Sequence, residues 1–206
     1  MSIFDTDRSK AVTDSASPNA AFRPGFTTRD ITAAALLAAL TAASAIISVP
    51  IPGSGIPFSM QVFVVLLAGA AAGPKVAASA MVAYLAIGAA GGPVFAMMRS
   101  GPAVLLGPSG GYLASFPVAA AAVGMIVGRR SPLSMGRSLL GMAIGLALIY
   151  AGGAARLLWL TGKPLGAVVQ IGVLPFLPLD LLKTLAAAHV AVRLRTRFAN
   201  PSTSSK

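Results

Sequence analysis

The chain has 206 residues, of which 56% are hydrophobic and 10% are charged, with a net charge of +11 and no cysteine. About a quarter of the residues of a soluble domain are charged, so this composition excludes a soluble protein and predicts an all-α membrane protein with one domain. It also excludes disulfides and thiolate metal sites, and we expect no metal site of another kind. The basic residues stand at the ends of apolar runs, which indicates orientation in a lipid bilayer rather than nucleic-acid binding.

Six apolar spans lie between two polar ends. Residues 1–28 are rich in Ser, Thr, Asp, Ala and Pro and show no signal-peptide pattern, so we expect a disordered cytoplasmic tail. Residues 29–197 form the predicted six-helix transmembrane domain, and residues 198–206 form a second cytoplasmic tail. The expected spans are 31–49, 59–73, 75–88, 112–128, 139–155 and 178–197, with Asp30 at or just before the first cap.

The connection at 50–57 reads P-I-P-G-S-G-I-P, which is too rich in proline and glycine for a regular element. It carries apolar side chains and no charge, which suits a lid over a partly apolar pocket or, as an alternative, a tight turn between helices. The lid residues are Ile51, Gly53, Gly55, Ile56 and Phe58. We also expect an irregular stretch at 91–107 and a loop at 156–163.

The basic residues predict the direction of the spans. Of the 16 Lys and Arg residues, twelve lie on the inner side and three on the outer side if the N-terminus is cytoplasmic, and Lys183 lies within a span. Both termini are therefore expected in the cytoplasm. The inner set is Arg8, Lys10, Arg23, Arg29, Lys75, Arg129, Arg130, Arg137, Arg193, Arg195, Arg197 and Lys206, and the outer set is Arg99, Arg156 and Lys163.

The stretch at 174–183 holds the one acidic residue of the apolar body, Asp180, three residues before Lys183. Residues three apart share a helix face, and an ionisable pair inside a membrane is expensive, so we expect a functional site. Pro178 favours a helix start that puts Asp180 in the first turn, where the peptide dipoles favour a carboxylate. The alternative is a self-neutralising pair that locks two helices together.

An intramembrane serine protease is another class to weigh. Ser109, in G-P-S-G at 107–110, and His189 form a pair of the kind that rhomboid proteases use. However, Ser109 enters from the outer side and His189 lies near the inner edge, so their depths differ by about 15–20 Å, beyond hydrogen-bond reach. The chain also has no nucleotide-binding motif, so it cannot hydrolyse ATP itself.

Several short motifs follow one another along the chain: P-F-S-M-Q at 57–61, L-A-G at 67–69, Y-L-A-I-G at 84–88, G-P-V-F at 92–95, G-P-S-G-G-Y-L at 107–113 and P-F…D-L-L-K at 175–183. In this order they resemble the motifs of the BioY family. The resemblance covers nearly everything from about residue 31 onward. Ser109 departs from the threonine usual in the family but keeps the hydroxyl, and the membrane body contains no asparagine.

The resemblance implies a biotin-specific S component of an energy-coupling factor (ECF) transporter in the bacterial cytoplasmic membrane, and no enzyme. It implies six helices, biotin as the ligand, no cofactor, and as partners a transmembrane T component and two ABC-type ATPase subunits that alone hydrolyse ATP. A solitary vitamin carrier and an S component for another vitamin are the alternatives, and an accessory structural membrane protein is a third option.

The implied binding residues include Asp180 and Lys183 as the polar floor of the site. Gln61, Ser59 or a tyrosine would replace a missing asparagine, and Arg99 would bind the carboxylate of the ligand or be an ordinary outer charge. The other candidates are Tyr84, Ser109 and Tyr112.

Small residues on the first span suggest a surface for a partner. The alanines at 34 and 38, and those at 35 and 39, are four apart and therefore share a helix face. The resemblance implies that such a face docks against the T component. The alternative is that Ala34, Ala35, Ala38 and Ala39 pack against the chain's own helices.

Overall fold

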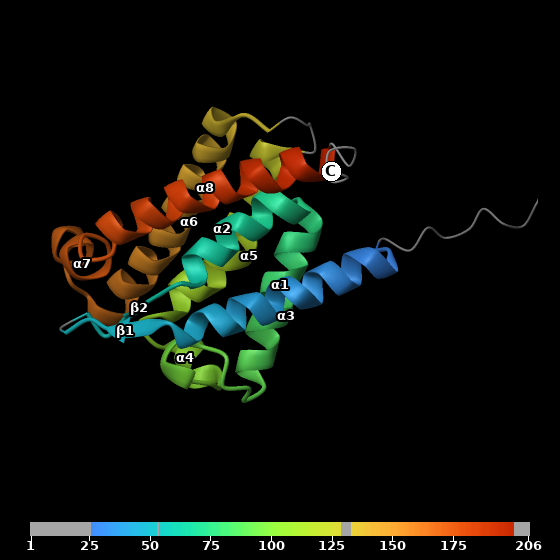
Figure 1. The fold of residues 1–206 in the computed structure, drawn as a ribbon. Helices are drawn as coiled ribbons and strands as arrows, with labels where there is room; N and C mark the ends of the chain where they lie inside the picture. Colours follow the sequence, from blue (N-terminus) through green and yellow to red (C-terminus); the bar gives the residue numbers. More distant parts are fainter. Residues whose placement is uncertain (1–25, 53, 129–132, 200–206) are drawn as a thin grey trace, which may run out of the picture.

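The computed structural model describes residues 26–52, 54–128 and 133–199. Helices dominate these ranges, together with a two-stranded antiparallel sheet (Figure 1). In chain order the elements are α1 (Thr28–Ile46), β1 (Ser48–Pro50), β2 (Pro57–Ser59), α2 (Gln61–Ala72), α3 (Pro74–Ala89), the 3₁₀ helix η1 (Ala96–Met98), α4 (Pro102–Leu106), α5 (Gly110–Val127), α6 (Met135–Thr161), α7 (Leu165–Gly172) and α8 (Leu177–Ala199).

Local sequence explains where the first helices begin and end. Thr27 caps α1, and its backbone N–H donates to the carboxylate of Asp30 at 3.0 Å, which completes a capping box. Asp30 therefore lies in the first turn and is not the cap itself. Gly73 follows α2 with a φ of 81°, a conformation that favours glycine, and Pro74 begins α3, so the chain reverses in a minimal turn.

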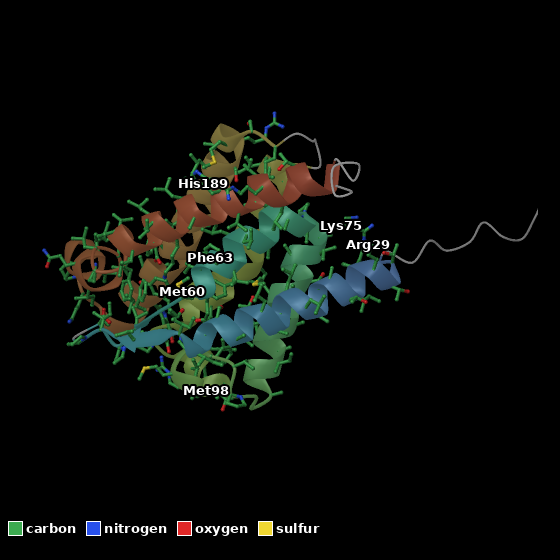
Figure 2. All side chains as sticks on the ribbon, in the orientation of Figure 1. Arg29, Met60, Phe63, Lys75, Met98 and His189 are labelled. Atoms are coloured by element: carbon green, nitrogen blue, oxygen red, sulfur yellow. The ribbon has the colours of Figure 1, made fainter. Side chains whose placement is uncertain are left out.

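The longer helices form one bundle. Helix α5 packs along α6, α3 and α2, α1 packs along α3, and α8 packs against α2 and α6. The strands β1 and β2 lie at one end of the bundle together with α4 and α7, and we call this the hairpin end (Figure 1). The start of α1 and the end of α8 lie at the opposite end, as do the labelled side chains of Arg29 and Lys75 (Figure 2).

Within the described residues, three helices, α1, α5 and α6, are long and apolar enough to cross a membrane. Helices α7 and α8 pass the same test together, with a bend of 58° between them. Helices α2 and α3 are apolar but have 12 and 16 residues, fewer than the roughly 20 that a perpendicular crossing needs. With these helices the chain has the form of a multi-pass membrane protein.

The connection at 50–57 is not wholly irregular, which corrects the sequence-based expectation. Its two ends pair as a β-hairpin in which Val49 lies opposite Phe58 and Pro50 lies opposite Pro57. Proline has no backbone N–H to donate, so the ladder stops at this pair and the tip stays free of strand structure. Gly53, at the tip, lies outside the described residues.

The expected loop at 156–163 is also wrong in part. Helix α6 continues to Thr161, so Arg156 and Trp159 lie on its last turns, with the guanidinium carbon of Arg156 4.6 Å from the centre of the Trp159 ring. Of the three residues, Lys163 alone lies in the connection.

Helix α7, which follows Lys163, was not predicted, and α4 occupies part of the stretch expected to be irregular. The predicted tails up to residue 25 and from 200, and Arg129 and Arg130, lie outside the described residues.

Candidate functional site

A cavity lies inside the bundle near the hairpin end. Its walls come from β2, α2, η1, α4, α5, α6 and α8 and from the turns beside them. The lining is Ile56, Pro57, Phe58, Ser59, Gln61, Val62, Phe95, Ala96, Arg99, Val104, Ser109, Tyr112, Leu113, Phe116, Ile149, Tyr150, Phe176 and Asp180. The cavity is thus mainly apolar and aromatic, with a few polar groups, as is typical of small-molecule sites.

Asp180 reaches the cavity because of how α8 begins. The prolines at 175 and 178 lack a donor N–H, and the chain bends between α7 and α8 before Asp180 enters the first turn of α8. This confirms the predicted helix start. The Asp180 side chain is buried, and its carboxylate is stabilised at the positive end of the helix dipole. The Thr184 hydroxyl donates to the Asp180 carbonyl at 2.7 Å one turn later.

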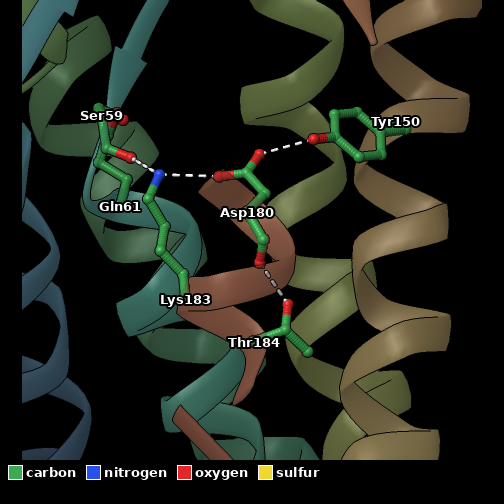
Figure 3. Close-up of polar contacts among 6 residues, drawn as sticks. All are labelled: Ser59, Gln61, Tyr150, Asp180, Lys183 and Thr184. Atoms are coloured by element: carbon green, nitrogen blue, oxygen red, sulfur yellow. Dashed lines mark hydrogen bonds and ion pairs between the residues drawn. The ribbon is translucent and has the colours of Figure 1, made fainter. Parts of the chain in front are cut away.

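Lys183 forms the predicted ion pair with Asp180. Its Nζ donates to Asp180 Oδ1 at 2.7 Å, and both side chains are at most 6% exposed (Figure 3). The same ammonium group donates to the carbonyl of Ser59 at 2.5 Å and lies 3.5 Å from the centre of the Phe58 ring. Lys183 does not line the cavity; it joins the carboxylate to strand β2.

Tyr150 is a member of the site that the sequence analysis missed. It lies on α6, lines the cavity and donates its hydroxyl to Asp180 Oδ2 at 2.7 Å (Figure 3). Both carboxylate oxygens of Asp180 therefore accept a hydrogen bond from the protein. A tyrosine in the middle of a continuous apolar helix gives no sequence signal beyond its own polar atom.

A second polar chain supports the start of α2. The Ser59 hydroxyl donates to Gln61 Oε1 at 2.8 Å, the Gln61 amide donates to the Tyr84 hydroxyl, and Tyr84 donates to the carbonyl of Val94 at 3.0 Å. Gln61 lines the cavity, whereas Tyr84 lies behind it with its ring edge-on to Phe95. Tyr84 is therefore placed to orient Gln61 and not to line the cavity itself.

Tyr112 stands where α5, α6 and α7 meet. Its hydroxyl donates to the carbonyl of Gly172 at 2.8 Å, and its ring lies directly against Gly153. A side chain at either glycine would occupy the place of the tyrosine, so both positions need glycine for close approach. Ser109 and Arg99 line the same cavity, and the Arg99 Nε donates to the carbonyl of Ala96 at 3.3 Å.

The hairpin forms one wall of the cavity. Ile56 and Phe58 line the cavity. Ile56 also belongs to the buried hydrophobic core of the bundle, and Ile51 packs against that core. The Ser54 hydroxyl holds the tip by donating to the carbonyls of Ile51 at 3.0 Å and Ile56 at 2.9 Å. Gly55 has a φ of 66° and faces Pro108 of the turn before α5, so the tip rests against that turn.

Ser109 and His189, the pair weighed and rejected as a protease site, lie apart in the structure, as expected. Ser109 lines the cavity at the start of α5. His189 is exposed, lies on α8 nine residues after Asp180 (Figure 2) and has its Nδ1 3.0 Å from the carbonyl of Leu185. Nine helical residues span about 13 Å, so the imidazole stands far along α8 from the cavity.

The two alanine pairs on α1 differ in burial. Ala38 is buried in the core and Ala34 packs partly buried against it, so this pair serves the packing of the chain itself. Ala35 and Ala39 are exposed, beside the exposed Leu36. A surface for a partner on α1 is therefore restricted to the second pair and its neighbours.

The comparisons with known proteins agree with this architecture. The chain matches the model of the BioY family over residues 14–200. It is 35% identical over 167 residues to the biotin transporter BioY of Thermotoga maritima, covering 81% of this chain and 96% of that protein. It is 37% identical, over the same shares, to the probable biotin transporter BioY of Pyrococcus horikoshii. A solved structure, the S-component for biotin from an ECF-type ABC transporter, has the same fold, with a TM-score of 0.73, 24% identity, and 83% of this chain and 95% of that chain covered.

We predict that Lys183→Met lowers the free energy of unfolding by about 3–5 kcal/mol, because it leaves the buried Asp180 carboxylate without its cation. The measurement is the melting temperature of the purified protein in detergent. Adding Asp180→Leu to Lys183→Met is expected to recover most of the loss, since no charge then remains buried. The exposed Lys163→Met is the control and should leave the melting temperature unchanged. A Lys183→Met protein as stable as the parent would contradict the prediction.

Proposed function

Because the chain belongs to the BioY family, we propose that it serves in biotin uptake and binds biotin in the cavity at the hairpin end. The chain is a transport protein and not an enzyme, in keeping with its relatives. The observation that carries the proposal is the buried carboxylate of Asp180 on the wall of an apolar, aromatic cavity. Such a charge is retained inside a membrane protein at functional sites.

The chemistry of biotin fits the lining. Its ureido ring offers two N–H donors and a carbonyl acceptor, its fused rings are apolar, and its tail ends in a carboxylate. The Asp180 carboxylate accepts a hydrogen bond from a ureido N–H. Lys183, on the side of the hairpin, holds the Asp180 carboxylate in place. Phe116 and Phe176 supply apolar surface for the rings. Charged hydrogen bonds of this kind contribute about 1.5–3 kcal/mol each.

The remaining polar groups of the lining suit the rest of the ligand. Arg99 is the cation on the wall of the cavity and binds the tail carboxylate. Gln61 and Ser109 supply neutral hydrogen-bonding groups, and Tyr84 keeps the Gln61 amide in its orientation. The Tyr112 hydroxyl already donates to the Gly172 carbonyl, so Tyr112 offers the ligand the apolar surface of its ring.

We propose that the cavity faces the outside of a bacterial cytoplasmic membrane, and that α1, α2, α3, α5, α6 and the α7–α8 pair make six crossings. Both termini then lie in the cytoplasm. Arg29 and Lys75 support this direction because they lie at the end opposite the hairpin, where basic residues mark the cytoplasmic side (Figure 2). Arg195, whose guanidinium donates to the carbonyl of Ala70 at 2.7 Å, lies at that end too.

The energy for uptake comes from other subunits. The chain carries no nucleotide-binding motif, and its fold matches an S-component of an ECF-type ABC transporter. We propose that it works with a transmembrane T component and two ABC-type ATPase subunits. The exposed pair Ala35 and Ala39 on α1 forms the docking surface, because small side chains let another helix backbone approach closely.

The hairpin acts as a lid in this proposal. The hairpin forms one wall of the cavity, so a ligand can enter on this side only when that wall moves. In the described part of the chain, the polar contacts from the hairpin to the bundle are the Lys183–Ser59 bond and the bond from the Met97 N–H to the Ser48 hydroxyl at 2.8 Å. Its other contacts are the packing of its apolar side chains and of its tip. Its outward movement would admit the ligand.

The purified protein should bind radiolabelled biotin and neither thiamine nor riboflavin. Asp180→Asn should weaken biotin binding at least tenfold, because a neutral amide replaces a charged acceptor. Thr41→Val, which removes a buried hydroxyl on α1 away from the cavity, is the matched control and should bind as the parent does. Binding of another vitamin in place of biotin would overturn the ligand assignment. A folded Asp180→Asn protein with unchanged affinity would remove Asp180 from the site.

We expect biotin to shorten and narrow the distance distribution between spin labels at Pro52 on the hairpin and Lys163 beyond α6, because the hairpin opens to admit the ligand and then stays closed over it. Both positions are exposed, and the absence of native cysteine makes two introduced cysteines the sole labelling sites. Pulsed electron paramagnetic resonance provides the measurement, with labels at Ala143 and Lys163 as a control pair that stays constant. The same distribution with and without saturating biotin would count against a lid.

Replacing Ala35 and Ala39 together with Trp should abolish co-purification with the T component and biotin uptake, while biotin binding persists. The reason is that bulky rings prevent the close approach of the partner helix. Ala143 and Ala147 are exposed alanines with the same spacing on α6, so their replacement with Trp is a matched control. If binding and folding are lost together with docking, the α1 face is internal and the docking proposal fails.

A further inference from the structure

We propose that Tyr150 is a positioning residue of the biotin site, which acts by fixing the Asp180 carboxylate as an acceptor for the ligand. The inference rests on the proposed function, since it concerns the same cavity. Tyr150 is the group from α6 that touches Asp180, whereas Lys183 belongs to the same helix as the carboxylate it binds. The carboxylate is therefore held from two separate directions (Figure 3).

The geometry divides the two oxygens between two donors. Oδ1 accepts from Lys183 at 2.7 Å and Oδ2 accepts from Tyr150 at 2.7 Å. A carboxylate has about four lone-pair directions, so these two bonds prevent rotation and leave one acceptor direction on each oxygen. Because Asp180 lines the cavity, its free acceptor directions are available to a ligand that donates N–H groups.

The role of Tyr150 differs from that of a packing residue. Its ring lines the cavity and is only partly buried, whereas its hydroxyl forms the bond to Asp180. Removing the hydroxyl alone, in Tyr150→Phe, keeps the ring and frees the carboxylate to turn about its Cβ–Cγ bond. The carboxylate then loses orientation before the ligand arrives, and affinity falls because that order must be restored on binding.

Tyr150 also differs from Tyr84 and Tyr112. These two tyrosines donate to backbone carbonyls, of Val94 and Gly172, and so fix the positions of chain segments. Tyr150 donates to an ionised side chain, and charge-assisted hydrogen bonds are about twice as strong as neutral ones. Among the three tyrosines of the chain, Tyr150 is the one whose hydroxyl acts on the ligand-binding carboxylate.

A double-mutant cycle tests this assignment. Biotin affinity is measured for the parent, Tyr150→Phe, Asp180→Asn and the double variant, with Thr41→Val as the control for loss of a buried hydroxyl. Tyr150→Phe should weaken binding about tenfold. In the Asp180→Asn background the same change should cost less than about twofold, because a residue that acts through Asp180 has nothing left to position. Equal losses in both backgrounds would show a direct ligand contact and overturn the proposal, as would unchanged affinity of Tyr150→Phe.

Infrared spectroscopy gives a readout that does not need the ligand. The carboxylate stretching band of Asp180 is the band lost in Asp180→Asn, and it should shift in Tyr150→Phe and stay constant in Thr41→Val. An unshifted band would overturn the proposal even if affinity falls. If the parent protein binds no biotin, the proposed function fails, whereas a shifted band would still support the Tyr150–Asp180 contact.

Discussion

Moving a carboxylate and an ammonium group out of water costs several kilocalories per mole for each ion, and attraction between them offsets this only with good geometry and further hydrogen bonds. Asp180 and Lys183 meet this condition at 2.7 Å. The Tyr150 hydroxyl and the Ser59 carbonyl bind the remaining polar atoms, from α6 and β2 respectively. One ion pair on α8 thereby joins α8, α6 and the hairpin around the cavity, and the arrangement of the site depends on it.

The same pair connects ligand binding to the hairpin. Asp180 lines the cavity, and the cation that binds it also holds Ser59 and contacts the ring of Phe58. A ligand N–H that donates to a free acceptor direction of Asp180 is therefore connected to β2 through the ion pair, which stays in place. This gives a physical route from occupation of the cavity to one of its walls, without any change in the helical bundle.

The sequence predicted the parts of the site that rest on short spacing. The D-L-L-K spacing and Pro178 were sufficient to place Asp180 in a first helical turn beside Lys183, and the structure confirms both. The hairpin was missed because proline and glycine penalise strands in general, yet here Pro50 and Pro57 only end the ladder. Helix α7 was missed because a short apolar segment between two spans has no distinctive periodicity.

Contacts between distant segments were the part that the sequence could not supply. Tyr150 lies 30 residues from Asp180, and nothing in the apolar run of α6 indicates which of its faces meets α8. Similarly, the two alanine pairs of α1 look alike in sequence, and only the packing of Ala38 in the core separates them. Arg156 and Trp159 were predicted to lie in a loop, whereas α6 continues through both residues and the guanidinium of Arg156 lies over the Trp159 ring.

The most direct measurement is an experimental structure of the protein with biotin bound. We expect a ureido nitrogen within about 3 Å of Asp180, the Tyr150 and Lys183 bonds to that carboxylate retained, and the tail carboxylate near Arg99. Biotin bound with its tail at Asp180, or outside the cavity between the hairpin and α8, would contradict it.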